Sequence, residues 1–379
     1  MSSKLDAFNF QIVVQYLFFS DDFVNSILVC KKFECVLDRF RYNPIQVRCK
    51  RLFPYMETQH LYQLTDPKIF SVKNYVVWYP VCYSHAKSYQ NDLTYTFKNI
   101  RISNSDLENV DKLEEILNDK HIKIYSANVL NKFDVIEFKV PHHVTLLEDF
   151  VFQENLHLEK ITLCEGIHTL PQYFCNRCTK LTSINFPSSV TRICESAFSN
   201  CGFEKMEIPS SVVYIEDSAF FNCQQLKEMK VSESVKILCA SVFENCTNLT
   251  YVVLPNDLTK IQMSAFKNCI SLEMIKIHEN VEHIEKYAFE GCEKIKELMF
   301  SANCELEGDD FINCTSLTNL VLPILDGKVK YKYSEYDGNI VQNFYEMFPR
   351  VDENLENDLE DTESQNLTDE KVCVLLLFY

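Results

Sequence analysis

The 379-residue chain carries 37 basic and 54 acidic side chains, so its formal net charge at neutral pH is −17. Nucleic acids and anionic membranes are themselves negative, so this charge argues against either one as the main partner. The hydrophobic fraction, 46%, is sufficient for a continuous core. No segment approaches the roughly 20 apolar residues that a membrane-spanning helix needs, so we predict no transmembrane segment.

The N-terminal residues give an expectation for the location of the protein. Residues 1–8 lack a basic stretch followed by a long apolar core and a small-residue cleavage site, so no secretory signal is evident. We therefore expect a cytoplasmic protein. A surface or nuclear location stays open.

Residues 1–55 are predicted to form a small head of two or three short helices. Val13, Val14 and Leu17 mark one apolar helix face, and the polar run 20–22 offers residues that cap a second helix.

The segment from Tyr16 to Phe33 resembles the F-box motif. It carries tyrosine-leucine at 16–17, an aspartate pair at 21–22, and valine-cysteine-lysine at 29–31 before an aromatic residue. In that family the motif docks a Skp1-type linker of a cullin ubiquitin ligase, and a repeat domain behind it holds the substrate. The resemblance implies a set of linker-binding residues, namely Leu17, Phe23, Val29 and Phe33.

An α/β connecting and capping segment is expected over 56–134. Runs of aromatic and β-branched residues predict strands at 75–79 and 95–102, and a further strand is expected at 121–125. Apolar residues at helical spacing predict an amphipathic helix over 106–117.

The range 135–323 repeats one phrase of 22–24 residues. Each unit reads Leu-x-x-Ile-x-Ile, then Val-x-x-Ile, then Ala-Phe-x-Asn-Cys. The alternation in the first part predicts a short strand with an inward apolar pair. Such a period is typical of a leucine-rich repeat solenoid, whose coils stack on one another. The aromatic anchor of the phrase recurs at Phe152, Phe174, Phe198, Phe220, Phe243, Phe266, Phe289 and Phe311.

One repeat position is a cysteine in seven units. Neighbouring coils place equivalent side chains about 4.8 Å apart, which exceeds the roughly 3.8 Å between the Cβ atoms of a disulfide. We therefore interpret the column as buried, reduced thiols. The asparagine that precedes the cysteine in most units is expected to hold the turn by bonding nearby backbone. The cysteines of the column are Cys178, Cys201, Cys223, Cys246, Cys269, Cys292 and Cys314.

The repeat phrase resembles the BspA-type leucine-rich repeat. The resemblance covers about half of the chain and implies a mainly β solenoid with a concave strand side and an irregular convex side. The unit at 300–311 is one residue short and loses its second apolar pair, as is common at the end of an array.

Two further segments are expected after the repeats. Residues 324–349 are predicted to cap the array, and 350–379 to form an acidic, disordered tail with an apolar end. From 350 to 371 there are nine acids and two bases, a composition typical of disorder. The last eight residues are apolar and are expected either to dock on the body or to act as a short linear motif.

The sequence gives no reason to expect catalysis, a cofactor or a metal. Cys175 and Cys178 have the spacing of half a zinc site, but no second pair follows at the required distance. Neither a glycine-rich phosphate loop nor a nucleophile elbow is found. We predict a protein that is not an enzyme.

The variable positions of the strands are predicted to form a concave binding surface. Apolar residues gather there toward the C-terminal units, whereas the earlier units are polar and charged. Exposed apolar residues clustered on a sheet often mark an interface, although strand propensity or cover by the C-terminal segment would also account for them. The predicted partner-binding residues are Tyr251, Val253, Met274, Lys276, Met299 and Val321.

These patterns favour a protein–protein recognition module. The first hypothesis is the substrate receptor of a cullin-type ubiquitin ligase, which binds its target on the concave face and a Skp1-type linker at the head. The alternative is an interaction scaffold, or a cell-surface adhesive protein as some BspA-like proteins are. In that alternative the head only shields the first coil, as any repeat array requires.

Overall fold

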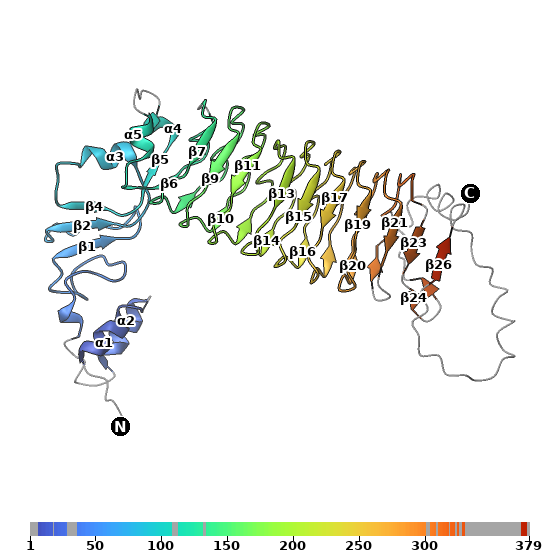
Figure 1. Ribbon diagram of the computed structural model, residues 1–379. Helices are drawn as coiled ribbons and strands as arrows, with labels where there is room; N and C mark the ends of the chain where they lie inside the picture. The colour runs from blue at the N-terminus through green and yellow to red at the C-terminus, as the bar shows by residue number, and fades with distance from the viewer. Residues whose placement is uncertain are drawn as a thin grey trace. The chain divides into compact units, whose positions relative to one another are not determined.

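The computed structural model describes residues 7–17, 19–28, 36–107, 113–131, 134–300, 304–307, 310–317, 319–322, 324–325, 328–329 and 373–376. The chain divides into two compact units. The N-terminal unit contains residues 1–126 and 143–146, and the repeat unit contains 127–142 and 147–379. Most elements of both are labelled in Figure 1.

The N-terminal unit begins with two short helices, α1 (Ala7–Val14) and α2 (Ser20–Leu28). Asp21 and Asp22 lie in the first turn of α2, where negative charge is favourable to the helix dipole. Phe23 is fully buried, and its ring packs edge-on against two others at centroid distances of 6.5 and 5.6 Å. The partner rings are those of Phe40 and Phe53, which follow the 3-10 helix η2 (Leu37–Arg39).

Parallel strands form two small sheets in the rest of the N-terminal unit. One sheet has the order β1-β2-β4, and the other contains β3, β5 and β6 in that order. Because β2 and β4 each precede a strand of the other sheet, the chain coils between the two sheets, as it does in a solenoid. The strands are β1 (Thr58–Leu61), β2 (Asn74–Val77), β3 (Val81–Cys82), β4 (Tyr95–Phe97), β5 (Ile100–Ile102) and β6 (Ile122–Tyr125).

Most elements expected between 56 and 134 are present with shifted bounds. The strand expected at 95–102 is two strands, because the chain crosses from one sheet to the other at Lys98 and Asn99. There the backbone N–H of Lys98 donates to Val77, and the carbonyl of Asn99 accepts from Val81. The helix expected at 106–117 is described as α4 (Asn104–Leu107) and α5 (Leu113–Leu117), and α3 (Tyr83–Ser88) was not expected.

One face of the repeat unit consists of the first strand of each coil. Within each sheet of this row the strands pair in parallel register. From β7 to β17 and in β21 the middle residue is at least half-buried while its neighbours point outward, and in the two-residue β19 Ile275 is buried and Met274 is exposed. We call the outward side of this row the strand face. The row comprises β7 (Glu137–Lys139), β9 (Lys160–Thr162), β11 (Ser183–Asn185), β13 (Lys205–Glu207), β15 (Glu228–Lys230), β17 (Tyr251–Val253), β19 (Met274–Ile275), β21 (Glu297–Met299) and β23 (Asn319–Leu322).

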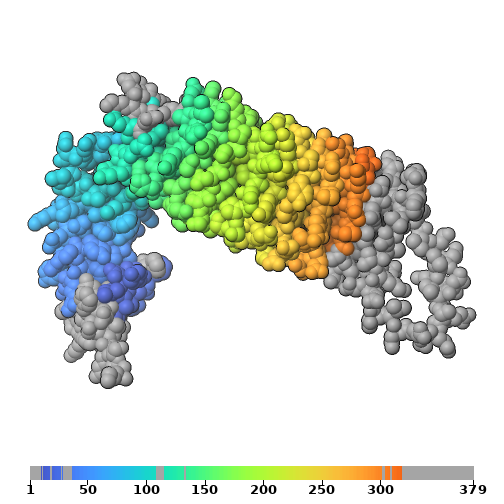
Figure 2. Space-filling model, viewed as in Figure 1, coloured from blue at the N-terminus to red at the C-terminus, as the bar shows by residue number. Residues whose placement is uncertain are grey.

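The second strand of each coil is only two residues long. Its second residue is buried in every case, which confirms the extended Val-x-x-Ile piece expected from the repeat phrase. Successive coils lie side by side in chain order, as the colour gradient from green to orange in Figure 2 shows. The second strands are β8 (Leu146–Leu147), β10 (Thr169–Leu170), β12 (Arg192–Ile193), β14 (Tyr214–Ile215), β16 (Ile237–Leu238), β18 (Lys260–Ile261), β20 (His283–Ile284) and β22 (Glu305–Leu306).

The anchor phenylalanines form a column of rings through the core. From Phe198 to Phe311 each ring stacks on the next with centroids 5.5 to 6.5 Å apart and planes within 22° of parallel. Phe152, Phe174 and Phe198 instead meet edge to face. Both arrangements are favourable for aromatic pairs. The rings therefore give each coil an apolar contact with the coil on either side.

The cysteine column lies beside these rings and consists of free, buried thiols. Each Sγ donates a hydrogen bond to a backbone carbonyl 25 or 26 residues earlier. For Cys223 and Cys246 the acceptors are the carbonyls of Phe198 and Phe220, at 3.1 and 3.2 Å. Burial raises the pKa of the Cys223 thiol to about 12, so the thiol keeps the proton that it donates.

Each turn has left-handed backbone at two positions, which are occupied in most units by the serine and the asparagine of the phrase. Asn200, Asn222, Asn245 and Asn268 have φ between 55° and 61°, a conformation that asparagine tolerates better than most residues. We expected their side chains to bond nearby backbone, whereas the hydrogen bonds observed join them to other side chains. The Nδ2 of Asn268 donates to Oδ1 of Asn245 in the preceding coil at 2.9 Å, so the amides bond to one another from coil to coil. The serines at the second position are Ser196, Ser218, Ser241 and Ser264.

The described C-terminal residues are short antiparallel strands. β26 (Cys373–Leu376) pairs with β23 and lies at the end of the sheet β21-β23-β26. β24 (Ile324–Leu325) pairs with β25 (Lys328–Val329). Part of the apolar end of the expected tail thus forms a strand on the last repeat. The rest of the expected cap and acidic tail lies outside the described residues.

Candidate protein-binding face

A groove of about 500 Å³ opens on the strand face over β17, β19 and β21. Three large side chains project beside it: Tyr251, Met274 and Met299 have exposed fractions of 47, 66 and 57%. Successive side chains of a strand point to opposite faces. Val252 and Ile275 are buried in the core, so Tyr251 and Met274, which precede them, point outward.

The register of the strands brings the predicted partner-binding residues together. Tyr251 is paired with Met274 across β17 and β19, so their side chains lie side by side. Val253, Lys276 and Met299 also line the groove. The backbone of Val321 pairs with that of Met299 on the next strand. Five of the six predicted residues therefore share one groove, and their role in binding stays a prediction.

The groove crosses a division in the sheet. β19 is the last strand of the sheet β13-β15-β17-β19, whereas β21 is the first strand of the next sheet. β19 is also one residue shorter than β17, so Lys276 lies beyond its end. In the repeats that the structure describes, the strand row is also divided between β11 and β13. At the later division the outward side chains include the exposed methionines Met274 and Met299, together with the charged Lys276 and Glu297.

Sequence reasoning missed several residues of the groove. It considered only the third and fifth positions of each repeat phrase, whereas residues at the strand ends and in the following turns also reach the cavity. A signal was present in the alternation Ile275-Lys276-Ile277, which continues past the end of the strand. The missed lining residues with polar side chains are Glu233, Asn256 and His278. Glu297 stands at the third position of its phrase, but it was left out of the predicted partner-binding residues.

The earlier half of the strand face has a different chemistry. Lys205 on β13 lies 2.8 Å from Glu228 on β15, and Lys230 pairs in the opposite sense with Glu207. Lys160 and Glu137 form a similar pair at 3.4 Å. The hydrogen bond and charge of Glu207 raise the pKa of Lys230. Charges on these strands are therefore matched within the face itself.

The comparison with known families agrees with the repeat geometry. The family model described as the BspA type leucine rich repeat region matches residues 81–204 and 191–318 in six copies, more than half of the chain. The chain belongs to the BspA-type leucine-rich repeat family. This membership confirms the resemblance expected from the repeat phrase. The match begins within the segment 56–134, where the strands of the N-terminal unit are also parallel.

Several solved structures are similar to this BspA-type chain in fold. A leucine-rich repeat protein of T. pallidum shares 23% identity, with 45% of this chain and 82% of that chain covered and a TM-score of 0.42. A leucine-rich repeat protein from Bacteroides ovatus shares 18%, with coverages of 74 and 84% and a TM-score of 0.42. The pneumococcal vaccine antigen PcpA shares 17%, with coverages of 69 and 73% and a TM-score of 0.31. Comparison with curated proteins returned no match.

Two of the four predicted linker-binding residues, Leu17 and Phe23, lie within the described part of the head. Phe23 is fully buried, so its assignment to a linker-facing surface is corrected: it is a core residue of the head. Leu17 is half-buried and lines a hollow of about 350 Å³ with Tyr16, Ile45 and Tyr62 among its neighbours. Val29 and Phe33 lie outside the described residues.

The paired cysteines of the BspA-type repeats were also considered as metal ligands. Cys175 and Cys178 are both fully buried, and burial followed by the neighbouring thiol of Cys178 raises the pKa of Cys175 well above its usual value. Within the described ranges no three His, Cys, Asp or Glu side chains gather in a metal-binding arrangement. Among the helices that the structure describes, none is both long and apolar enough to cross a bilayer.

Proposed function

We propose that this BspA-type protein is a non-enzymatic recognition module that binds a protein partner on the strand face. The observation that carries the proposal is the cluster of Tyr251, Met274 and Met299, which are exposed beside one groove, the first two on paired strands. A leucine-rich repeat protein is suited to protein–protein interaction or surface adhesion, and the proposal places the binding site within the repeats.

The residue types of the groove support this placement. Tyrosine and methionine are enriched in the buried centres of interfaces, where a rim of polar residues surrounds them. Methionine also adapts its shape to a partner because its side chain is unbranched and polarisable. Lys276, Glu233 and His278 provide such a rim around the apolar centre. Because the strands are held by the coils on either side, binding would order little backbone.

The test introduces charge at the centre of the groove. We expect Tyr251→Glu with Met274→Glu to reduce the recovery of specific partners at least tenfold in quantitative affinity purification, because two carboxylates would have to be desolvated. Isolated partners would then be titrated against both proteins. Retention of every partner by a folded double variant would contradict the proposal.

A matched control is available on another side of the same repeats. Ile237 and Met263 have exposed fractions of 42 and 48%, close to that of Tyr251, and both lie outside the strand face. Ile237→Glu with Met263→Glu adds the same charge to the same unit. The control should keep its partners, and a thermal melt should show that both double variants are folded.

We further propose that the helical head binds a Skp1-type linker. The protein would then be the substrate receptor of a cullin-type ubiquitin ligase. The observation that favours it is the exposure of apolar residues around α1 and α2, including Tyr16, Phe19 and Leu28. Exposed apolar residues gathered on a small surface suit a partner helix. Phe23 takes no part in this surface because it is buried.

Titration of the full chain with a purified Skp1-type protein tests the head separately. Micromolar binding that is lost in Tyr16→Asp with Leu28→Asp would support the linker role. A lack of binding by the unaltered chain would leave a scaffold or an adhesive protein, with the head as a cap.

The location of the protein separates these alternatives further. We propose a cytoplasmic location, with which the column of free, buried thiols is compatible, since thiols stay reduced there. An adhesive role would instead require display on the cell surface. Protease treatment of intact cells should leave the chain uncut if the location is cytoplasmic, and cleavage would favour the adhesive alternative.

A further inference from the structure

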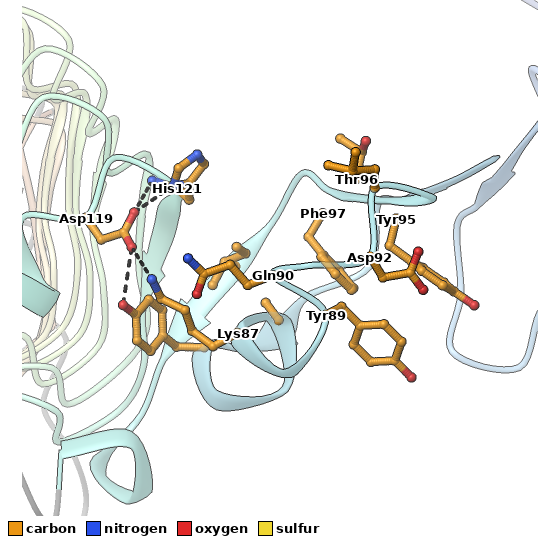
Figure 3. Close-up of a pocket in the computed structure, with 13 residues that line it drawn as sticks. Lys87, Tyr89, Gln90, Asp92, Tyr95, Thr96, Phe97, Asp119 and His121 are labelled. Atoms are coloured by element: carbon orange, nitrogen blue, oxygen red, sulfur yellow. Dashed lines mark hydrogen bonds and ion pairs between the residues drawn. The ribbon is translucent and has the colours of Figure 1, made fainter.

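The N-terminal unit contains a cavity of about 380 Å³ that neither proposed binding surface uses (Figure 3). It lies beside α3 and β4, and we call it the α3 pocket. Figure 3 shows that its labelled residues form two groups, with Tyr89, Tyr95 and Phe97 in one group and Lys87, Asp119 and His121 in the other.

The first group is an aromatic wall. The centroid of the Tyr89 ring lies 4.8 Å from that of Tyr95 and 5.9 Å from that of Phe97. Tyr95 and Phe97 are two residues apart on β4, so they lie on one side of the strand, with ring planes within 13° of parallel. All three residues are half-buried, so they pack on one another and still present ring surface to the cavity.

The second group is a polar wall organised by Asp119. Its carboxylate accepts bonds from the backbone N–H of His121 at 3.0 Å and from the Tyr83 hydroxyl at 3.2 Å, and it lies 2.8 Å from Nδ1 of His121. The ammonium group of Lys87 lies 3.5 Å away. Burial acts to raise the pKa of Asp119, but the hydrogen bonds from His121 and the electrostatic attraction of His121 and Lys87 outweigh it and lower the pKa. Asp119 is therefore a fixed, ionised framework for its neighbours.

These contacts disfavour a charged ligand. An anion would meet Lys87, whose charge Asp119 already compensates. A cation would bind over a ring face, but Lys68 already lies 4.8 Å from the centroid of Tyr95, and Lys87 lies 5.2 Å from that of Tyr83. The pocket thus favours a neutral ligand with an apolar face.

The polar groups around the cavity indicate what else the ligand should carry. The Gln90 amide both donates and accepts hydrogen bonds, and the Lys87 ammonium group donates. His121 contributes its second ring nitrogen, Nε2, since its Nδ1 lies against Asp119. A ligand that satisfies this mixture needs several groups that donate and accept at short spacing. Hydroxyl groups on a ring have that property.

We propose that the α3 pocket binds a neutral saccharide unit. One face of a sugar ring presents polarised C–H groups, which suit the negative face of an aromatic ring such as Phe97 or Tyr89. Its hydroxyls would reach Gln90, His121 and Lys87. The cavity lies at the small end of the usual size range for ligand pockets, which suits a single sugar ring.

The experiment uses the full chain and a panel of neutral saccharides. Saturation-transfer NMR with glucose, galactose, mannose and N-acetylglucosamine should detect at least one ligand, with an affinity in the millimolar range. Phe97→Ala and Gln90→Ala should each weaken that affinity at least fivefold. Because Gln90 is exposed, its variant keeps the test valid if Phe97→Ala unfolds.

Phe70→Ala is the matched control, since Phe70 is an almost fully exposed aromatic residue of the same unit and does not line the pocket. It should bind the saccharide as the unaltered chain does. The proposal is overturned if no saccharide binds at about 20 mM, a concentration well above a dissociation constant of about 1 mM. It is equally overturned if Gln90→Ala binds the saccharide as tightly as the unaltered chain does.

Discussion

The two halves of the strand face share one backbone and differ in what they present. On β13 and β15 the outward residues are Lys205 and Glu228, which pair with each other. In the same column, β17 and β19 present Tyr251 and Met274. The buried residues of the repeat therefore determine the backbone geometry of the face, whereas the outward residues determine its polarity and charge. The earlier half satisfies its own charges, and the later half keeps apolar surface available for a partner.

The largest expected effect tests whether both halves depend on the same core. Phe220→Ala and Phe266→Ala remove stacked rings beneath the earlier and the later half. Each should lower the free energy of unfolding by about 3–5 kcal/mol, because a large cavity is left in a close-packed core. Denaturant unfolding measures the loss. A cost below about 1 kcal/mol at either site would show that the ring column is not shared.

The second prediction concerns binding by the two halves. Tyr251→Ala should weaken the affinity for an isolated partner by at least about 2 kcal/mol, the usual threshold of an interface hot spot. Lys205→Ala, in the same column of the earlier half, should change that affinity by less than about 0.5 kcal/mol. Isothermal titration calorimetry gives both values. Equal losses would remove the distinction between the halves.

The third prediction uses the thiol column, which runs beneath both halves. Burial raises the pKa of Cys223 and Cys314 to about 12, whereas an unfolded thiol titrates near pH 9. Since the folded pKa is the higher one, this contribution to stability is complete below pH 9 and is lost as the pH rises toward 12.

Unfolding free energies measured between pH 8 and 11 should therefore fall with pH. Cys223→Ala should reduce the slope, although it also removes a hydrogen bond and some volume. A slope that is unchanged when several column cysteines are replaced would show that other groups cause the pH dependence.

The smallest effect is expected for the ion pairs of the earlier half. Lys205 and Glu228 are about half or more exposed, so a double-mutant cycle should give a coupling energy below about 1 kcal/mol that weakens as salt is added. A larger coupling that persists in salt would indicate that these charges hold the coils together and do not merely hydrate the face.

The repeats could be predicted from the sequence because their period is regular. The spacing of the phenylalanines and cysteines required stacked coils, and the alternation around Val252 and Ile275 determined which residues point outward. The parallel coils of the N-terminal unit were harder to predict. Their paired strand residues are 16 residues apart for Thr58 and Asn74 but 20 apart for Tyr75 and Tyr95, so no fixed period marks them.

The candidate sites were predicted less completely than the fold. Periodicity placed Tyr251 and Met274 on one surface, but it could not show that β19 ends early and that the sheet divides beside it. Phe23 was assigned to the surface of the head because a motif does not reveal which side of a short helix packs on Phe40 and Phe53. The α3 pocket was not expected, since the chain brings its residues together from several elements.

Site-specific photocrosslinking tests the central claim most directly. A photoreactive residue at position 274 lies in the groove, whereas one at position 183 lies exposed on β11 in the earlier half of the strand face. In cells, position 274 should form covalent adducts with a discrete partner and position 183 should not. Adducts of equal yield at both positions, or at 183 alone, would contradict the assignment of the binding site to the apolar half.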